Sequence, residues 1–315
     1  MKQLKQMLKK HPLLFHSISS VWSIVRKIPV WLRWSGARCI RIDDFENGVL
    51  ILNRNSSLGR KGEIVYTPQD NTIFKFVIEH GEWEIDESQF LADRIIRDVK
   101  SSKIKLKPVF IDIGANSGLV TRQVLNLSQS DCDVVLVEPI PNHVKAIRAN
   151  LENFDRNNNL LIVEAALGEK NGEFEISIDN SNRGNSSFLP SAMPSTGFRK
   201  LIVKTIAVSD FVEQYIPNAD SYIVKSDTQG FDSKILALFP ADFWNKCVGA
   251  VVEVWALPEV EAIQVEKLLK MWKKFSNLSW SANGSAPTNL QEIADFWLSK
   301  SSKSKNLFLS NSTTD

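Results

Sequence analysis

The sequence predicts an α/β fold built on a mostly parallel β-sheet. From residue 108 onwards, short apolar runs alternate with segments whose apolar residues recur at helical spacing. The apolar runs are the expected strands, over residues 109–114, 133–138, 160–167, 221–227, 247–255 and 306–310. The expected helices cover about 118–128, 144–152, 231–239, 259–274 and 289–300. Strands that alternate with helices in this way are typical of a parallel sheet with helices on both faces.

The chain ahead of this alternation is predicted to be β-rich. Residues 49–52, 63–66 and 72–79 form short apolar or alternating runs, separated by Gly, Asn and Pro, and such runs are typical of strands. Residues 87–100 carry apolar side chains at helical spacing and predict a helix. Further along, residues 179–197 are polar and long for a connection, which is typical of a lid or a binding loop.

Charge is distributed unevenly along the chain. Residues 1–42 contain nine Lys or Arg and no acidic residue, so the other 29 basic and 36 acidic residues leave a net charge of −7. An acidic body argues against a nucleic-acid partner, which needs a basic face. Residues 13–27 predict an amphipathic helix, which either packs on the body or anchors the chain at a membrane surface. We therefore divide the chain into a basic helical tail (1–42), a β-rich region with a helix (43–100) and an α/β domain (101–315).

Cysteine, histidine and hydropathy exclude several classes of protein. Cys39, Cys132 and Cys247 lie far apart, which argues against a disulfide framework and a structural zinc site. With only four His in the chain, we expect no metal centre and no Ser–His–Asp hydrolase. We find no apolar run of about 18 residues and no signal-peptide cleavage site. We expect a cytoplasmic protein, with residues 1–42 suited to peripheral contact at the inner membrane surface.

Polar residues gather at the ends of the predicted strands, where open α/β sheets bind their ligands. The first strand ends in DIGANSG (112–118), whose glycines permit a sharp turn and close approach of a ligand. A dinucleotide turn counted from Gly114 needs glycine where Asn116 and Leu119 stand. Glu138 ends the second strand 20 residues after Gly118 and can accept both ribose hydroxyls of an adenosine cofactor.

These two strand ends predict an adenosine-containing cofactor and leave NAD and S-adenosylmethionine as alternatives. The broken glycine pattern argues against NAD. Asp112, at the end of the first strand, favours a cofactor with a cationic amino-acid portion. His143 follows Glu138 closely, and we expect a surface histidine at a helix start, with contact to the adenosine as the alternative.

Several blocks, in order, resemble a known family. They are DIGANSG, VEPIPN with Asn150 after it, AALGEKNGEFEI, GNSS and VKSDTQGFDSKIL. The series resembles the FkbM family of S-adenosylmethionine-dependent methyltransferases over roughly residues 80–256, and GEWEIDESQFL (81–91) is similar to the segment ahead of the family's first strand. The resemblance implies a class I methyltransferase fold: a Rossmann-like, mostly parallel seven-stranded sheet with helices on both faces. Here an N-terminal helix and a small β-rich region precede it.

The resemblance also implies which residues hold the cofactor. Those that would line its methionine portion are Asp112, Gly114, Asn116 and Gly118. Glu138 would bind the ribose, and Glu164 and Ala165, after the third strand, would lie near the adenine.

The last block would face the methyl group and the acceptor, through Asp227, Gly230 and Asp232. This chain departs from the family there, because Gln229 and Asp232 stand where the family often has two Glu. The departure rules out an essential carboxylate at position 229, while the shorter Asp232 can still serve.

The chemistry of methyl transfer suggests roles for three further side chains. If the acceptor is a hydroxyl, a base helps to remove its proton. Asp227, at a strand end, is the first candidate for this base and Glu253 is the second. Lys225 alternates with Asp227 along its strand and can hold Asp227 ionised. The alternatives are a helix cap for Asp227 and a structural ion pair for Glu253. We expect the acceptor to contact Asn185, Ser186, Asp232 and Trp255.

The sequence thus predicts an S-adenosylmethionine-dependent methyltransferase that O-methylates a sugar, a glycan or glycolipid precursor, or a secondary metabolite. Two other functions stay open. One is an NAD-dependent Rossmann oxidoreductase, and the other is a non-catalytic interaction module that keeps the methyltransferase fold.

Overall fold

The computed structural model describes residues 39–41, 48–51, 56–60, 62–67, 71–101, 106–154, 159–179, 186–187 and 198–311. The helix predicted over 13–27 lies outside these residues, as does Asn185. The central sheet has seven strands in the order β13-β14-β12-β11-β4-β5-β6. They are β4 (Val109–Ile113), β5 (Asp133–Val137), β6 (Leu160–Val163), β11 (Tyr222–Ser226), β12 (Cys247–Trp255), β13 (Asn277–Ser279) and β14 (Ser304–Ser310). β14 runs antiparallel to both neighbours, so the other six strands share one direction.

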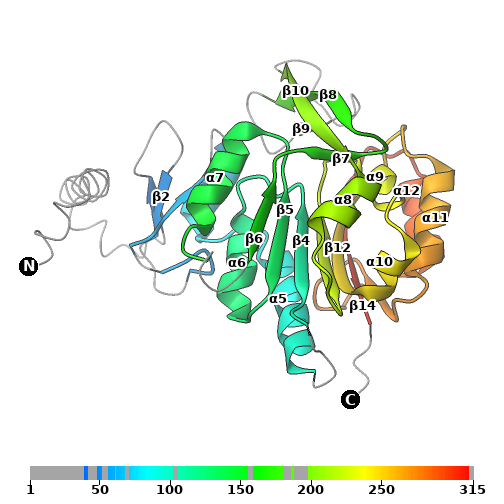
Figure 1. The fold of residues 1–315 in the computed structure, drawn as a ribbon, viewed down its shortest axis with the longest axis horizontal. Coiled ribbons are helices and arrows are strands. Elements are labelled where there is room, and N and C mark those ends of the chain that lie inside the picture. The colour runs from blue at the N-terminus through cyan, green and yellow to red at the C-terminus, as the bar shows by residue number, and fades with distance from the viewer. Residues whose placement is uncertain are drawn as a thin grey trace, which may run out of the picture.

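Helices cover both faces of this sheet (Figure 1). One layer consists of α5 (Ile85–Lys100), α6 (Leu119–Ser128) and α7 (Pro141–Leu151). The other consists of α8 (Val208–Tyr215), α9 (Asp232–Leu236), α10 (Ala241–Lys246), α11 (Ala262–Trp272) and α12 (Leu290–Trp297). Alternate residues of each strand point to opposite layers, so Ile111 packs in the α8–α12 core and Phe110 in the α5–α7 core. The architecture confirms the class I methyltransferase fold expected from the sequence.

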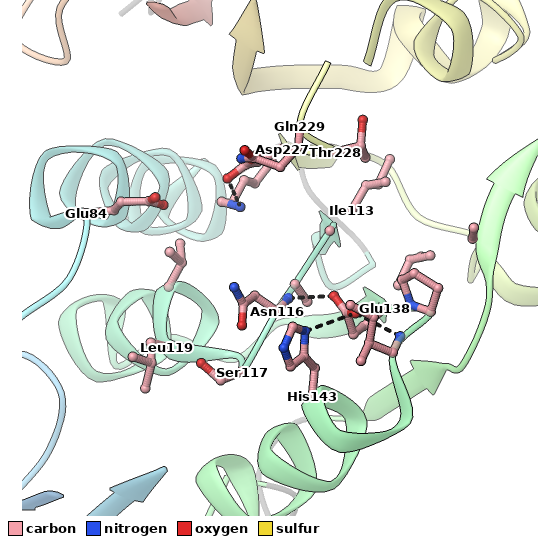
Figure 2. A pocket seen from close by; sticks show the side chains of 18 of the residues that line it. Glu84, Ile113, Asn116, Ser117, Leu119, Glu138, His143, Asp227, Thr228 and Gln229 are labelled. Carbon is pink, nitrogen blue, oxygen red and sulfur yellow. Dashed lines mark hydrogen bonds and ion pairs between the residues drawn. The ribbon is translucent and has the colours of Figure 1, made fainter. Parts of the chain in front are cut away.

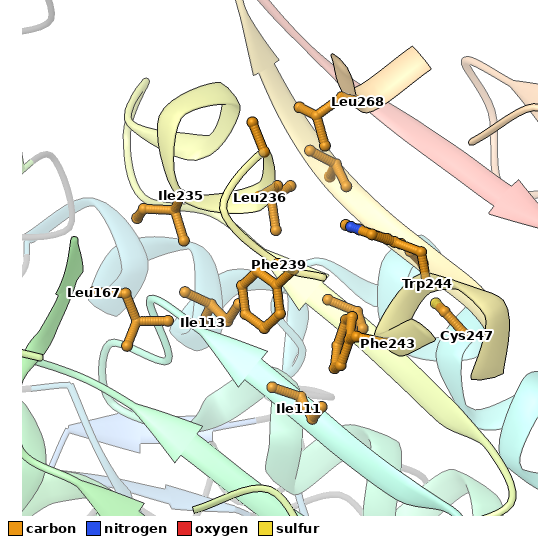
Figure 3. Packing of buried hydrophobic residues seen from close by; sticks show 14 of the residues in the cluster. Ile111, Ile113, Leu167, Ile235, Leu236, Phe239, Phe243, Trp244, Cys247 and Leu268 are labelled. Atoms are coloured by element: carbon orange, nitrogen blue, oxygen red, sulfur yellow. The ribbon is translucent and has the colours of Figure 1, made fainter. Parts of the chain in front are cut away.

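Aromatic side chains fill the core under α8–α12 (Figure 3). Phe239, Phe243 and Trp244 are buried, and the Phe243 and Trp244 rings meet edge to face with centroids 5.6 Å apart. Trp244 continues to Trp272 at 5.6 Å, and Trp272 to Trp297 at 5.9 Å. Burial of such large apolar surfaces stabilises this half of the molecule.

A second, small sheet has the order β7-β10-β8-β9 and stands at one end of the central sheet (Figure 1, top of the view). Its strands are β7 (Ala166–Gly168), β8 (Gly172–Asp179), β9 (Ser186–Ser187) and β10 (Phe198–Ala207). The single strand predicted over 160–167 is therefore wrong, because the chain leaves the central sheet after Val163 and enters the small one at Ala166. Ile176 of the small sheet packs on Ile140, just beyond the carboxyl end of β5.

The region ahead of α5 holds a three-stranded sheet and a helix. The strands are β1 (Cys39–Arg41), β2 (Gly48–Ile51) and β3 (Ile64–Tyr66), and the helix is α4 (Asn71–His80). The strand predicted over 72–79 is wrong. Ile73, Phe74 and Val77 instead form one helical face that packs against Leu119 at the start of α6.

Two buried polar side chains tie this region to the main fold. The Arg122 guanidinium donates to the backbone oxygens of Leu58 and Asn150 and pairs with Glu63. The Asn150 side chain accepts from the backbone nitrogen of Tyr66 at 2.8 Å and donates to its backbone oxygen at 2.9 Å. A hydrophobic membrane-crossing helix is absent from the described part of the chain.

Candidate active site

A cavity of about 340 Å³ lies at the carboxyl ends of β4, β5 and β11 (Figure 2). Its apolar side is formed by Ile140, Ala166, Leu167, Ile176 and Ile235. The other lining residues include Trp83, Glu84, Asn116, Glu138, Lys225, Asp227, Gln229 and Trp255, which carry polar groups. The predicted gathering of polar residues at strand ends is therefore present, and it surrounds a space of the size that small-molecule sites have.

The turn after β4 forms one wall of this cavity. Gly114, Asn116 and Gly118 have φ angles of +78°, +51° and +74°, so every second residue is left-handed. Glycine and asparagine are the residues that accept this conformation best. The backbone N–H groups of Gly114 and Ala115 donate to Val137, and that of Gly118 donates to Ala115. Most backbone N–H groups of the turn are therefore already hydrogen-bonded within the protein, and few remain to bind a ligand.

Gly114 is required by a close contact with the β11 turn. A Cβ atom at this position would lie 1.9 Å from the backbone oxygen of Asp227. The predicted role of Gly114 was to admit a ligand, and Gly114 does line the cavity. Its missing side chain also lets the chain after β4 touch the chain after β11, which sets where Asp227 stands.

Glu138 is buried at the end of β5 and is held by backbone donors (Figure 2). One carboxylate oxygen accepts from the Asn116 N–H and the other from the Ile140 N–H, both at 2.9 Å. His143 Nδ1 lies 3.3 Å from Glu138 Oε1. His143 is buried and lines the cavity, so the predicted surface position of His143 is wrong. A carboxylate has about four acceptor sites, so Glu138 retains capacity for a ligand's hydroxyl groups.

Lys225 stands between two carboxylates. The pairing of β11 with β4 sets Lys225 opposite Asp112, and the ammonium lies 3.6 Å from Asp112 Oδ1 and 3.7 Å from Asp227 Oδ2. Burial opposes the charge of Lys225, but Asp112, Asp227, Glu84 and Glu253 outweigh it and raise its pKa. Lys225 is therefore a fixed positive charge at the floor of the cavity, and the predicted pairing of Lys225 with Asp227 is present.

Asp227 is ionised and oriented by its neighbours. Burial acts to raise the pKa of Asp227, but Lys225 and hydrogen bonds from Glu253 and Gln229 lower it overall. Gln229 Nε2 donates to Asp227 Oδ1 at 2.7 Å and to Glu253 Oε2 at 3.0 Å. Burial and the charge of Asp227 raise the pKa of Glu253 well above its usual range, so Glu253 is the protonated partner. The amide at position 229 bridges the two acids, a task that a carboxylate cannot perform at neutral pH.

Asp232 serves the turn that carries Asp227. Both its oxygens accept from the Thr228 N–H at 3.2 Å, and Ser226 Oγ donates to it at 2.5 Å. Burial and the charge of Asp227 raise the pKa of Asp232 to about 6. Asp232 does not line the cavity, so its predicted contact with the acceptor stays a prediction and its observed partners are in the turn.

Other predicted site residues lie away from the cavity. Asp112 is fully buried beneath it and accepts from Thr121 Oγ1 at 2.6 Å. Gly118 starts α6, where an added Cβ would lie 3.3 Å from Ile147. Glu164 is exposed and Ala165 packs in the core, whereas the following residues Ala166 and Leu167 line the cavity.

The remaining predicted acceptor contacts are Ser186, Trp255 and Asn185. Ser186 lies in β9 of the small sheet, where it pairs with Ile178 of β8. Trp255 is half-buried and lines the cavity, and its contact with the acceptor stays a prediction. Glu84 also lines the cavity and was not predicted. The one sequence signal for Glu84 is its position in GEWEIDESQFL, directly ahead of α5.

Comparison with known proteins gives structural likeness alone. No family model matches the sequence, and no curated protein matches it. Methyltransferase FkbM from Methylobacillus flagellatus KT is 10% identical, with a TM-score of 0.35 over 76% of this chain and 60% of that chain. Aeropyrum pernix fibrillarin with natively bound S-adenosyl-L-methionine is 9% identical, with a TM-score of 0.35 over 86% and 97%. Precorrin-6y C5,15-methyltransferase from Geobacter metallireducens GS-15 is 18% identical, with a TM-score of 0.26 over 56% and 68%. These low scores by themselves assign neither a family nor an activity.

Proposed function

We propose that this protein is an S-adenosylmethionine-dependent methyltransferase. The observation that carries the proposal is a single cavity with the buried Glu138 carboxylate on one wall and the ionised Asp227 on another. Glu138 offers acceptors for ribose hydroxyls at the end of the second strand. Asp227 offers a base directly after β11.

The residues present suit this cofactor. The apolar side of the cavity, with Ile140, Ala166 and Ile176, suits an adenine ring. The cavity lining has more carboxylates than ammonium or guanidinium groups: among the described residues, Glu84, Glu138 and Asp227 line the cavity, with Lys225 as the one Lys or Arg. Such a lining favours a ligand that carries sulfonium and ammonium charges over one that carries phosphates.

The same geometry argues against NAD. A dinucleotide site binds its pyrophosphate with the backbone N–H groups of the glycine turn and the helix that follows. Here the N–H of Asn116 is taken by Glu138, and those of Gly114 and Ala115 are taken by Val137. An anion at this turn would therefore meet few donors, and it would face the carboxylates of the cavity.

In the proposed reaction, the cofactor supplies a methyl group that its positively charged sulfur already activates. The protein then aligns the acceptor and removes its proton. Asp227 is suited to accept the proton of an acceptor hydroxyl, because it is ionised and its side chain is 21% exposed. Lys225 and Gln229 fix the Asp227 carboxylate, and Glu253 donates to it.

The acceptor class follows from this chemistry and from the resemblance to the FkbM family. We assign the protein to that family as part of the proposal, with a hydroxyl of a sugar, a glycan or glycolipid precursor, or a secondary metabolite as the acceptor. The half-buried ring of Trp255 at the cavity supports a sugar, because aromatic rings can stack on the apolar faces of sugars. The basic residues 1–42 support a cytoplasmic protein that contacts the inner membrane surface.

Transfer of a tritiated methyl group tests this function. The protein is incubated with S-[methyl-³H]adenosylmethionine and fractionated cell glycans and lipids. We expect label in one of these fractions with the unaltered protein, and a large loss of label with Asp227→Asn. Label that forms equally well with Asp227→Asn would contradict the role of Asp227, and absence of label in every fraction would contradict the acceptor class.

A further inference from the structure

The predicted partner for the amino-acid portion of the cofactor is not at the cavity surface. Asp112 was expected to meet that cationic group, but its side chain is fully buried and does not line the cavity. Its oxygens face Thr121 Oγ1 and the Lys225 ammonium. Asp112 is therefore not placed to contact the ammonium group of a ligand in the cavity.

Glu84 provides a carboxylate that does reach the cavity. Its side chain projects into the cavity from the start of α5, toward Asp227 (Figure 2). Among the described residues, no hydrogen bond or ion pair engages the Glu84 carboxylate. The Lys225 ammonium already lies within 3.7 Å of both Asp112 and Asp227. Glu84 therefore presents a carboxylate with open acceptor positions to whatever occupies the cavity.

The backbone at Glu84 is held in an uncommon conformation. Its φ and ψ of 44° and 53° are left-handed, which glycine and asparagine adopt far more readily than glutamate. The buried Gln123 fixes the preceding peptide, because Gln123 Oε1 accepts from the Trp83 N–H at 2.8 Å and Gln123 Nε2 donates to the Trp83 oxygen. Gln123 also donates to Ser88 Oγ at 2.8 Å, and the Ser88 N–H donates to the Glu84 oxygen at 3.0 Å. Strain that is maintained by several buried contacts is typical of functional positions.

The layout of the cavity indicates which portion of the cofactor faces Glu84. Figure 2 shows Glu84 and Glu138 on opposite sides, with Asn116 between them. Ile140 and Ile176 lie on the Glu138 side, where the small sheet packs. A cofactor with adenine among these apolar residues and ribose at Glu138 extends its amino-acid portion past Asn116 toward Glu84.

We propose that Glu84, in place of Asp112, binds the α-ammonium group of S-adenosylmethionine. This inference rests on the proposed cofactor. The carboxylate accepts hydrogen bonds from the ammonium, and the Gln123-held turn keeps it in position. A charge-assisted hydrogen bond of this kind contributes more to affinity than a neutral one.

Two ligands that differ in the amino-acid portion test the assignment by calorimetry. S-adenosylhomocysteine carries the α-ammonium group, and 5′-methylthioadenosine lacks the whole amino-acid portion. We expect Glu84→Gln to weaken S-adenosylhomocysteine by about tenfold or more, and to leave the affinity for 5′-methylthioadenosine unchanged. Glu79→Gln, at an exposed position on the neighbouring α4, removes one negative charge away from the cavity and should change neither affinity.

A second variant separates binding from folding. Asparagine accepts the left-handed backbone, so Glu84→Asn should melt at the same or a higher temperature and still lose affinity for S-adenosylhomocysteine. Unchanged affinity in Glu84→Gln, or equal weakening of both ligands, would overturn the assignment. Failure of the unaltered protein to bind S-adenosylhomocysteine would instead overturn the proposed function itself.

Discussion

Replacing Gly114 by alanine tests how the two strand-end turns support each other. The new Cβ would lie 1.9 Å from the Asp227 backbone oxygen and 2.8 Å from its carbonyl carbon, in a residue with φ of +78°. The left-handed backbone alone costs about 1–2 kcal/mol with a side chain. Moving the Asp227 backbone away adds about 1–3 kcal/mol. We therefore expect Gly114→Ala to lower the free energy of unfolding by about 2–5 kcal/mol.

Gly284→Ala is the matched control for this change. Gly284 has a similar φ of +74°, but no heavy atom lies within 4 Å of the position its Cβ would take. Only the conformational cost of about 1–2 kcal/mol applies there. Urea unfolding of both variants measures the difference, and affinity for S-adenosylhomocysteine should also fall in Gly114→Ala. Equal losses of stability in the two variants would refute the claim that Gly114 is required by contact with Asp227.

Three further predictions concern the charged groups of the site. Asp227→Asn should reduce the rate of methyl transfer by about 10²–10⁴-fold with little change in cofactor affinity, whereas Asp242→Asn on the exposed start of α10 should leave the rate unchanged. Burial, opposed by Lys225, raises the pKa of Glu84 to about 8. Glu84 is then mostly protonated at pH 7 and ionises when a cation binds, so calorimetry in buffers of different ionisation enthalpy should detect proton release that Glu84→Gln abolishes. Thr121→Val removes the hydroxyl that donates to buried Asp112 and should lower the free energy of unfolding by about 1–3 kcal/mol, measured by urea unfolding.

The parts of the fold that the sequence predicts well are those with strong local patterns. The runs 109–114, 133–138, 221–227 and 247–255 are all central strands, because strands buried on both faces are nearly continuous apolar runs. The run 72–79 satisfies strand and helix patterns together, and contact of Ile73 and Phe74 with Leu119 decides for the helix. Such a tertiary contact is not visible in the local sequence.

Charged strands and broken strands were harder to predict. β10 (Phe198–Ala207) has only three consecutive apolar residues between Lys200 and Lys204, pairs with β8 and β7 in the small sheet, and was not predicted. The break between β6 and β7 carries no Gly or Pro to mark it. Both features depend on pairing with distant strands.

Within the site, chain position was predicted better than side-chain environment. Glu138, Lys225 and Asp227 follow from their positions at strand ends. Asp112 has a similar position, but side chains alternate in direction along β4, and this directs Asp112 under the cavity, beside Thr121 of α6. The left-handed turn that brings Glu84 into the cavity depends on a buried glutamine in α6, at position 123, which no spacing rule connects to it.

Calorimetric titration of S-adenosylhomocysteine and of NAD into the unaltered protein and into Glu138→Ala tests which cofactor this cavity binds. Glu138 accepts hydrogen bonds at the end of β5 and lines the cavity, so we expect ribose binding to depend on it. We predict saturable one-to-one binding of S-adenosylhomocysteine, a loss of about tenfold or more in Glu138→Ala, and no binding of NAD. Saturable NAD binding without S-adenosylhomocysteine binding would contradict the proposed cofactor, and unchanged S-adenosylhomocysteine affinity in Glu138→Ala would contradict the role of Glu138.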